Sequence, residues 1–187
     1  MVKKTSLDMF IPLLLIFTVA LACSNDQTQK ANSLVDDANV SITDANKNSD
    51  DGLAKVYSME AMLPRIKSQN DLNLARSVAN DCIPILTKAK DKYTEAASKL
   101  EDAGKMSINE KLKEYLDLRA QEMKKRSEAM EAAVREPQAL IDSNSVSEYT
   151  FKVKSITESF KNLRQAAEDL AKKADKVQEE NKDVIKK

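Results

Sequence analysis

Few residues of this chain belong to types that do chemistry. Among its 187 residues there is no His, and there are two Cys and two Gly. Without His the sequence lacks the commonest general base, the commonest metal ligand and the Glu-x-x-His motif of di-iron helical bundles. Two Gly cannot build a phosphate-binding loop, and no Ser precedes a Lys by three residues as in the Ser-x-x-Lys acylation motif. We therefore expect no catalytic residue, no bound cofactor and no metal site, and a protein that is not an enzyme.

The two cysteines are the remaining candidates for covalent chemistry. Cys82 falls on an apolar stripe of a predicted helix, where a thiol is ordinarily a small hydrophobic group of raised pKa and low reactivity. Cys23 stands at the end of an apolar run that starts at Met9. Two cysteines cannot form a disulfide framework, so the position of Cys23 is the stronger indication of a modification.

Charge and composition exclude two further classes of protein. The 30 Lys+Arg are balanced by 30 Asp+Glu, whereas a nucleic-acid-binding surface is strongly basic, so we expect no nucleic-acid partner. The chain is 42% hydrophobic and 32% charged, which is typical of globular or long helical proteins. With two Gly and four Pro, it has too few turn-forming residues for a sheet protein.

The first 22 residues have the pattern of a secretory signal peptide. Lys3 and Lys4 precede an uncharged apolar run over residues 9–22, and small residues close the run. A membrane-spanning helix needs about 20 apolar residues, which is longer than this run. A basic start, a short apolar core and a small-residue end together predict that residues 1–22 are removed.

The end of this leader, Ala20-Leu21-Ala22-Cys23, resembles the lipobox of bacterial lipoproteins. The resemblance implies cleavage between Ala22 and Cys23, a diacylglycerol thioether on Cys23, and an acyl chain such as palmitate on the new amino terminus. Ala20-x-Ala22 would also suit an ordinary signal peptidase, which would leave Cys23 as a free thiol. The resemblance covers the leader alone and assigns the rest of the chain to no family.

The lipobox resemblance also implies a location. A lipid anchor places the protein in the bacterial cell envelope, bound to a membrane through its acyl chains. In the lipoprotein family, Asp after the modified Cys retains the protein at the inner membrane of enteric bacteria, and here Ser24 stands at that position. If the cell is diderm, this favours the outer membrane, on its periplasmic side or at its surface.

Beyond the leader, apolar residues recur in alternating steps of four and three. This average spacing of 3.5 residues is typical of helices packed as supercoiled neighbours. The stripes are Ala31, Val35, Ala38, Ile42, Ala45, Ser49, Gly52, Val56, Met59 and Leu63; Ala75, Ala79, Cys82, Leu86, Ala89, Tyr93, Ala96 and Leu100; Leu112, Leu116, Ala120, Met123, Ser127, Met130 and Val134; and Tyr149, Val153, Ile156, Phe160, Leu163, Ala167, Leu170, Ala174, Val177, Asn181 and Val184. We predict an all-α fold, an elongated antiparallel bundle of four long heptad-patterned helices over residues 28–185, behind a lipidated tether at 23–27. A three-helix bundle or coiled coil, with the first segment partly free, is the alternative.

The breaks between segments carry the signals of helix ends. Ser68, with Asp71 three residues later, predicts an N-terminal cap, and Pro64 predicts the end of the first helix. Gly104 is expected to end the second helix in the left-handed conformation. The runs Ser107–Glu110 and Ser145–Glu148 are expected to be capping boxes that open the third and fourth helices.

Three residues inside the helical segments predict irregularities. Pro84 and Pro137 each remove a backbone hydrogen bond and are expected to kink their helices. The kinks could line a pocket between the helices or could only fit long helices around their core. Gly52 is expected to weaken the first segment, as a hinge or as the boundary between two helices.

From these features we expect a non-enzymatic scaffold or protein-interaction module of the cell envelope, attached through Cys23. The expected partners are the membrane, through the lipid, and an envelope protein; a homo-oligomer is also compatible. The expected contact face is the first segment, because Ala31-Asn32, Ala38-Asn39 and Ala45-Asn46 repeat every seven residues with Asp37, Asp44 and Asp51 beside them. Its alternative role is that of a solvated helix surface. The alternative function is a periplasmic carrier of a small molecule or lipid.

Overall fold

The chain folds into four long α-helices in a computed structural model that describes residues 25–185. These are α1 (Asn25–Met62), α2 (Gln69–Gly104), α3 (Glu110–Ile141) and α4 (Val146–Glu180), with a 3-10 turn η1 (Leu63–Arg65) after α1. No strand occurs among the described residues. The predicted all-α fold is therefore confirmed. The signal peptide, its cleavage site and Cys23 lie outside the described residues.

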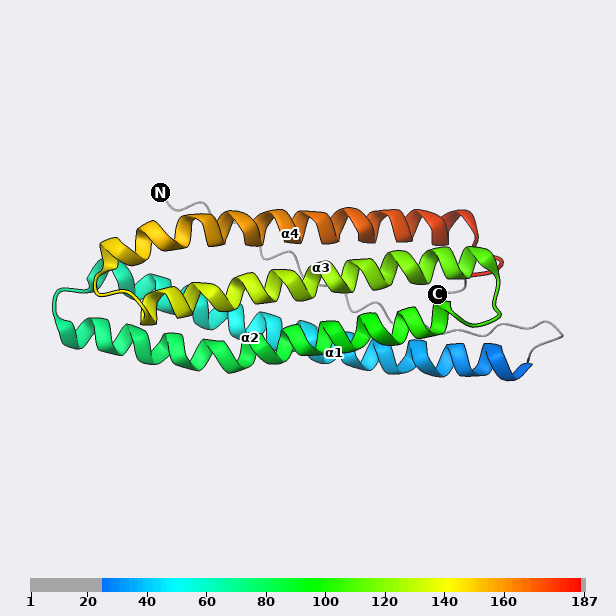
Figure 1. Ribbon diagram of the computed structural model, residues 1–187, viewed down its shortest axis with the longest axis horizontal. Helices are drawn as coiled ribbons and strands as arrows, with labels where there is room; N and C mark the ends of the chain where they lie inside the picture. Colours follow the sequence, from blue (N-terminus) through cyan, green and yellow to red (C-terminus); the bar gives the residue numbers. More distant parts are fainter. Residues whose placement is uncertain (1–24, 186–187) are drawn as a thin grey trace.

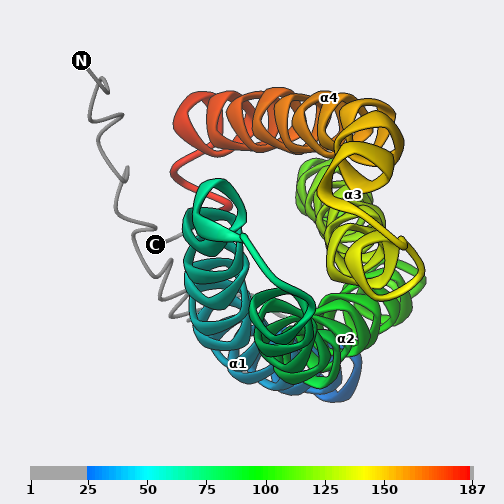
Figure 2. The same ribbon diagram turned by 90° about the vertical axis from the view of Figure 1, so that its left-hand side faces the viewer.

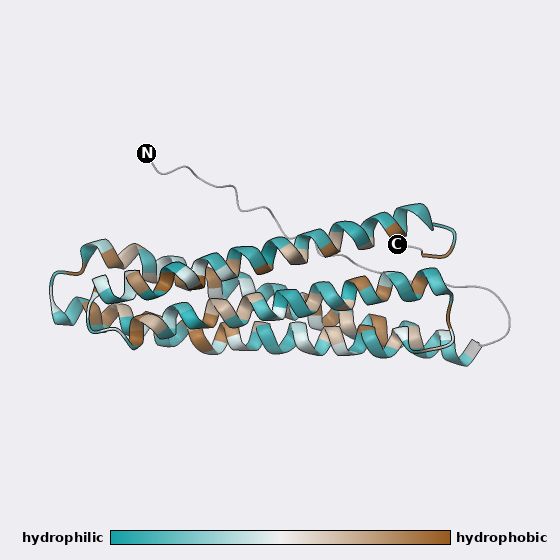
Figure 3. Cartoon of the chain, turned by 45° about the horizontal axis from the view of Figure 1, so that its top comes forward, coloured by the Kyte–Doolittle hydropathy of each residue, from teal (hydrophilic) through white to brown (hydrophobic). Residues whose placement is uncertain are grey.

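The helices form where the heptad stripes are, because each stripe supplies a continuous apolar face. All eight predicted stripe residues of α2 are buried, and the stripe of α1 is buried except for Ile42 and Leu63. Ala38 and Ala45 are completely enclosed. Their small side chains allow α1 and α2 to approach closely. The outer faces of the helices are largely hydrophilic (Figure 3).

Each helix packs against its neighbours in the sequence and runs antiparallel to them, as short connections require (Figure 1). Seen end-on, the helices form an arc in which α1 and α4 are the two ends (Figure 2). Helix α1 packs closely on α2, touches α3 little and scarcely approaches α4. The bundle is thus elongated and four-helical, but it is open on the side between α1 and α4.

The opening leaves α4 less buried than its sequence pattern suggests. Val153, Ile156, Phe160 and Leu163, on the most regular of the predicted stripes, are only half-buried. Beyond α4 the chain turns, and the side chain of Ile185 is enclosed as part of the hydrophobic core. The C-terminal turn is therefore packed against the bundle up to residue 185.

Helix α1 differs in two respects from its prediction. It begins at Asn25, inside the segment 23–27 expected to be a tether and three residues before the expected start of the bundle at residue 28. It also continues through Gly52, so the prediction of a break there is wrong. The reason is close packing: a Cβ at Gly52 would lie 2.6 Å from Cδ2 of Leu86. Gly52 is thus required by the approach of α2.

Of the five predicted helix ends, the end of α1 before Pro64 and the caps Ser68 and Ser145 are confirmed, and two are wrong. The Ser68 hydroxyl accepts a hydrogen bond from the Asp71 amide, whose carboxylate accepts from the Ser68 amide, which completes the capping box. At α4 the Ser145 hydroxyl accepts from the Glu148 amide, so Ser145 is the cap. The predicted capping box at Ser107 is wrong: Asn109 caps α3, because its side chain reaches the Lys111 amide at 2.8 Å. Gly104 is the last residue of α2 and is not left-handed.

The contact at Gly52 can be tested with the two glycines of the chain. Gly→Ala inside a helix ordinarily stabilises by about 1 kcal/mol. Gly52→Ala is expected instead to lower the free energy of unfolding by about 1–2 kcal/mol, because the new methyl overlaps Leu86, which is fully enclosed. Gly104→Ala is the matched control, since nothing lies within 4 Å of its Cβ position. Urea denaturation should show that the two changes have opposite signs; equal stabilisation at both positions would contradict the packing.

Candidate functional site

The open side of the arc contains a cleft with a volume of about 430 Å³. Helices α1, α3 and α4 line it, and no residue of α2 contributes to the lining. Leu53 and Val56 of α1, Ala133 of α3 and Phe160 of α4 supply apolar walls. Glu60, Glu136, Lys161, Arg164 and Glu168 supply charge. Volumes of this size are at the lower end of the range of small-molecule sites.

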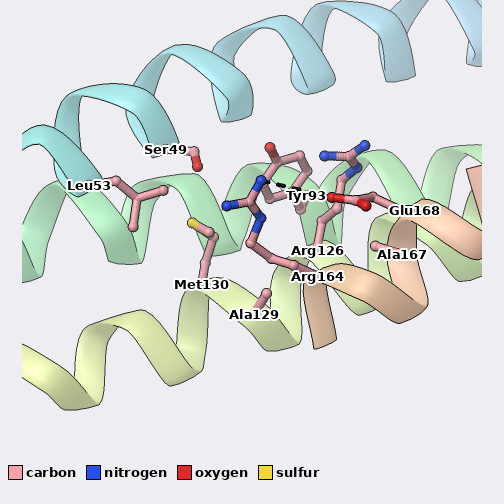
Figure 4. Close-up of a pocket in the computed structure, with 9 residues that line it drawn as sticks. All are labelled: Ser49, Leu53, Tyr93, Arg126, Ala129, Met130, Arg164, Ala167 and Glu168. Carbon is pink, nitrogen blue, oxygen red and sulfur yellow. Dashed lines mark ion pairs between the residues drawn. The ribbon is translucent and has the colours of Figure 1, made fainter. Parts of the chain in front are cut away.

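A small pocket continues the cleft toward α2 (Figure 4). Leu53, Arg164 and Glu168 line both, and the small pocket adds Tyr93 and Arg126. The side chains of Arg126 and Arg164 extend into it beside the Tyr93 ring (Figure 4). Its volume of about 20 Å³ is room for roughly one water molecule, so the larger cleft is the only one of the two that can hold an organic ligand.

A buried charged network joins α3 to α4 beyond this pocket. The Arg119 guanidinium donates to Glu122 at 2.8 Å, to Asp175 of α4 at 2.5 Å and to the Tyr115 hydroxyl at 3.2 Å. Arg126 donates to the second carboxylate oxygen of Glu122 at 2.8 Å. Arg119 and Glu122 are 7% and 3% exposed. Polar bonds, in addition to apolar contacts, therefore fix the position of α4.

A pair of carboxyl groups lies at the end of the cleft nearer the α1–α2 and α3–α4 connections. Glu136 of α3 is within hydrogen-bonding reach of Glu60 of α1, and the Tyr149 hydroxyl of α4 donates to Glu136 at 3.0 Å. Burial and the neighbouring Glu60 raise the pKa of Glu136 to about 7. Burial and the charge of Glu136 also raise the pKa of Tyr149. The pair therefore keeps a proton in acid and loses it as the pH rises through about 7.

Three of the four large exposed hydrophobic side chains among the described residues lie near one end of the bundle. Tyr57, Leu74 and Phe151 are 51%, 60% and 87% exposed. Tyr57 lies five residues before the last residue of α1, and Leu74 and Phe151 lie five residues after the first residues of α2 and α4. These helix termini are at the end of the bundle that contains the α1–α2 and α3–α4 connections. Arg76 of α2 donates to the Ser143 carbonyl, which ties α2 to the α3–α4 connection. We call this end, with Tyr57, Leu74 and Phe151, the distal end.

The structure places the residues predicted from the sequence in different environments. Asn32, Asn39 and Asn46, the residues of the expected contact face, are half-buried. Asn46 accepts a hydrogen bond from the Tyr93 hydroxyl at 2.7 Å, which makes it part of the α1–α2 packing. The accompanying Asp37, Asp44 and Asp51 are exposed. Helix α1 packs closely on α2, and α4 is the helix with the half-exposed apolar stripe.

The predicted irregular residues also separate. Pro84 lies on the exposed face of α2 and does not line the cleft, whereas Pro137 is enclosed and follows the lining residue Glu136. Only Pro137 therefore adjoins the cleft. Cys82 is completely buried, burial raises the pKa of its thiol, and the thiol donates to the Val78 carbonyl. Its predicted role as a small buried group is confirmed.

The residues that α3 contributes to the cleft and to the charged network were missed in the sequence. They belong to a second heptad stripe of α3. That stripe runs through Tyr115, Arg119, Glu122, Arg126, Ala129, Ala133, Glu136 and Leu140. Because half of its members are polar, an apolar pattern does not reveal it, although its spacing of four and three is regular. It is the face that α3 turns toward α4 and the cleft.

No family model, curated protein or solved structure matches the chain. Within residues 25–185, no group of three or more Cys, Asp or Glu side chains is placed to hold a metal ion. None of the described helices is long and apolar enough to cross a membrane. The arrangement of the cleft provides shape, charge and a shared proton, which are means of binding.

Proposed function

We propose that the protein is a lipid-anchored, non-enzymatic lipoprotein of the bacterial cell envelope that recruits another envelope protein through its distal end. The observation that carries this proposal is that Tyr57, Leu74 and Phe151, three of the four large exposed hydrophobic side chains among the described residues, lie near that end. Large exposed hydrophobic groups that gather in one region are typical of contact surfaces. The leader, with Ala22 and Cys23 at the expected cleavage site, supports attachment of the opposite end to a membrane.

The length of α1 sets the distance between the membrane and the distal end. Helix α1 starts two residues after Cys23 and has 38 residues, so it extends about 57 Å at 1.5 Å per residue. Its C-terminal end is part of the distal end. A lipid on Cys23 would thus hold the exposed hydrophobic residues about 50–60 Å from the membrane, where a protein partner of the envelope is accessible.

Site-specific crosslinking in intact cells tests this proposal. A photo-crosslinking residue at Leu74 or Phe151 is expected to yield an adduct with a specific second protein. Val40 is the matched control, because it is 64% exposed but lies in the middle of α1. Asn32, Asn39 and Asn46 serve as a second comparison set on the face favoured by the sequence. Adducts from Val40 or the three Asn, with none from the distal end, would contradict the assignment; adducts to a second copy of the chain would indicate a homo-oligomer instead.

The anchor is tested separately through its cysteine. Cys23→Ser is expected to abolish incorporation of labelled palmitate and to release the protein from the membrane fraction, because acyl chains supply the binding energy of about 0.8 kcal/mol per buried CH₂. Cys82→Ser, at the buried cysteine, should leave labelling unchanged. A wild-type chain that is secreted without acylation would refute lipidation.

A second candidate function is that of a carrier of a small molecule or lipid. The specific observation in its favour is the cleft of about 430 Å³ with apolar walls from three helices. Purified protein would then carry a ligand out of the cell, and organic extraction followed by mass spectrometry would detect it. Protein that is ligand-free as isolated and that takes up no offered amphiphile would exclude this candidate.

A further inference from the structure

We infer that the cleft binds an amphipathic amine, with its ammonium group between the carboxyl groups of Glu60 and Glu136 and its apolar part against Leu53, Val56 and Phe160. This inference rests on the carrier candidate and adds the chemical class of the ligand. It requires neither the lipid anchor nor a protein partner. The cleft, the carboxyl pair and the apolar walls are its basis.

The shape of the cleft separates the two parts of such a ligand. Glu60 and Glu136 lie toward the distal end, while Leu53 and Phe160 lie along the same cleft toward the middle of the bundle. A polar group at the carboxyl pair therefore leaves an attached chain beside apolar walls. Covering those walls removes apolar surface from water, which contributes about 25 cal/mol per Å². The half-buried Phe160 would become enclosed.

The carboxyl pair favours a cation. Two carboxyl groups in contact cannot both be ionised without repulsion, and here a proton satisfies them. A primary ammonium group has three donors and can bond to both carboxylates in place of that proton. The Tyr149 hydroxyl already donates to Glu136 at 3.0 Å, so one side of that carboxyl is fixed. From α2, the buried Cys82 thiol adds no charge.

Two positively charged side chains, Arg164 and Lys161, also line the cleft. Arg164 pairs with Glu168 at 3.9 Å toward the middle of the cleft, so its charge is offset there. Lys161 of α4 is exposed and its long side chain lines the cleft. It is a competitor for the carboxyl pair, and Lys161→Met should therefore strengthen the binding of an amine.

Binding of an amine should depend on pH with a defined sign. Below pH 7 the carboxyl pair keeps its proton, because burial and Glu60 raise the pKa of Glu136 to about 7. The ammonium must then displace that proton, so the Kd should fall about tenfold per pH unit from pH 5 to 7 and level off above it. An alkylamine stays protonated over this range, since amines of this type titrate near 10.4.

The test uses the mature chain from residue 23 with Cys23→Ser, which contains every described helix but no acyl chain. Decylamine, decanol and decanoate are titrated into it at pH 8 in a calorimeter. Decylamine is expected to bind at least tenfold more tightly than the other two. Glu136→Gln and Glu60→Gln should each weaken decylamine binding at least tenfold. Glu131→Gln, on the same helix but outside the cleft lining, should leave it unchanged.

The outcomes distinguish the inference from the carrier candidate. Equal or tighter binding of decanoate or decanol would overturn the amine class but leave the carrier candidate standing. Decylamine binding that neither Glu136→Gln nor Glu60→Gln weakens would place the amine elsewhere and overturn the inference. If none of the three compounds binds to protein that unfolds cooperatively, both the inference and the carrier candidate fail. Circular dichroism of each variant shows that lost binding is not lost folding.

Discussion

Arg119→Met is expected to lower the free energy of unfolding by about 3 kcal/mol, because it breaks a buried ion pair. The Arg119 guanidinium is 7% exposed and donates to Glu122, Asp175 and Tyr115. Removing one partner of a buried ion pair leaves the other charge in a place without water, which costs about 3–5 kcal/mol. Arg126 still bonds to Glu122, so the lower end of that range applies. Urea denaturation followed by circular dichroism measures it.

Two comparison variants serve as controls for Arg119→Met. Arg135→Met makes the same change on the same helix, but Arg135 pairs with Glu131 at the surface, so a loss below about 0.5 kcal/mol is expected. The double variant Arg119→Met with Glu122→Met removes both buried charges and should recover most of the loss, because apolar groups of similar size tolerate burial. A loss in Arg135→Met as large as that in Arg119→Met would show that the network is not specifically stabilising.

The sequence predicts burial well where helices pack through mainly apolar faces. Helix α2 packs against both α1 and α3, and the alternation of four and three predicts eight of its eleven buried residues. The same holds for α1, whose Ala-rich stripe faces one neighbour. Burial follows hydrophobicity there because most positions of the interface are apolar, with Ser41, Asn46 and Ser49 as the small polar exceptions. The fold class, the helix number and the antiparallel order could therefore be predicted.

The candidate site could not be predicted by the same means. Helix α3 has neighbours on two sides, and the side that faces α4 contains Arg119, Glu122 and Glu136 within a heptad spacing. A hydrophobic pattern treats these residues as solvent-exposed. Conversely, the regular stripe of α4 predicts complete burial, which the open arc does not provide. Whether a bundle closes depends on the packing of α1 against α4, two segments far apart in the sequence.

Helix ends show the same limit on a smaller scale. Ser107 and Glu110 have the spacing of a capping box, but Asn109 within that run is an equally good cap and lies directly before the helix. Gly104 suits a left-handed end, yet α2 ends without one because Lys105 continues in right-handed geometry. Sequence spacing identifies the region of a helix end, and local competition between residues selects the cap.

Glu136→Gln is expected to stabilise the protein at pH 8 and to leave its stability nearly unchanged at pH 5. The cause is the carboxyl pair: burial and the adjacent Glu60 raise the pKa of Glu136 to about 7, from an ordinary value of 4.5. An acid whose folded pKa is raised favours the folded state while it is protonated. This stability is fully present below pH 4.5 and is lost as the pH rises through 7.

The size and the controls of this effect follow from the same linkage. At about 1.36 kcal/mol per pKa unit, and with allowance for partial exposure of the side chain, wild type should lose about 2 kcal/mol between pH 5 and pH 8. Glutamine keeps an amide that can hydrogen-bond to Glu60 but has no proton to lose, so the unfolding free energy of the variant should be flat over this range.

Measurements stay above pH 5 because Glu95, whose bonds to Lys92 and Lys99 lower its pKa to about 2, acts with the opposite sign in acid. Glu131→Gln should retain the wild-type slope, since Glu131 is exposed on the outer face of α3. If Glu136→Gln also keeps that slope, the carboxyl pair does not hold the proton, and the pH dependence of amine binding inferred from it fails as well.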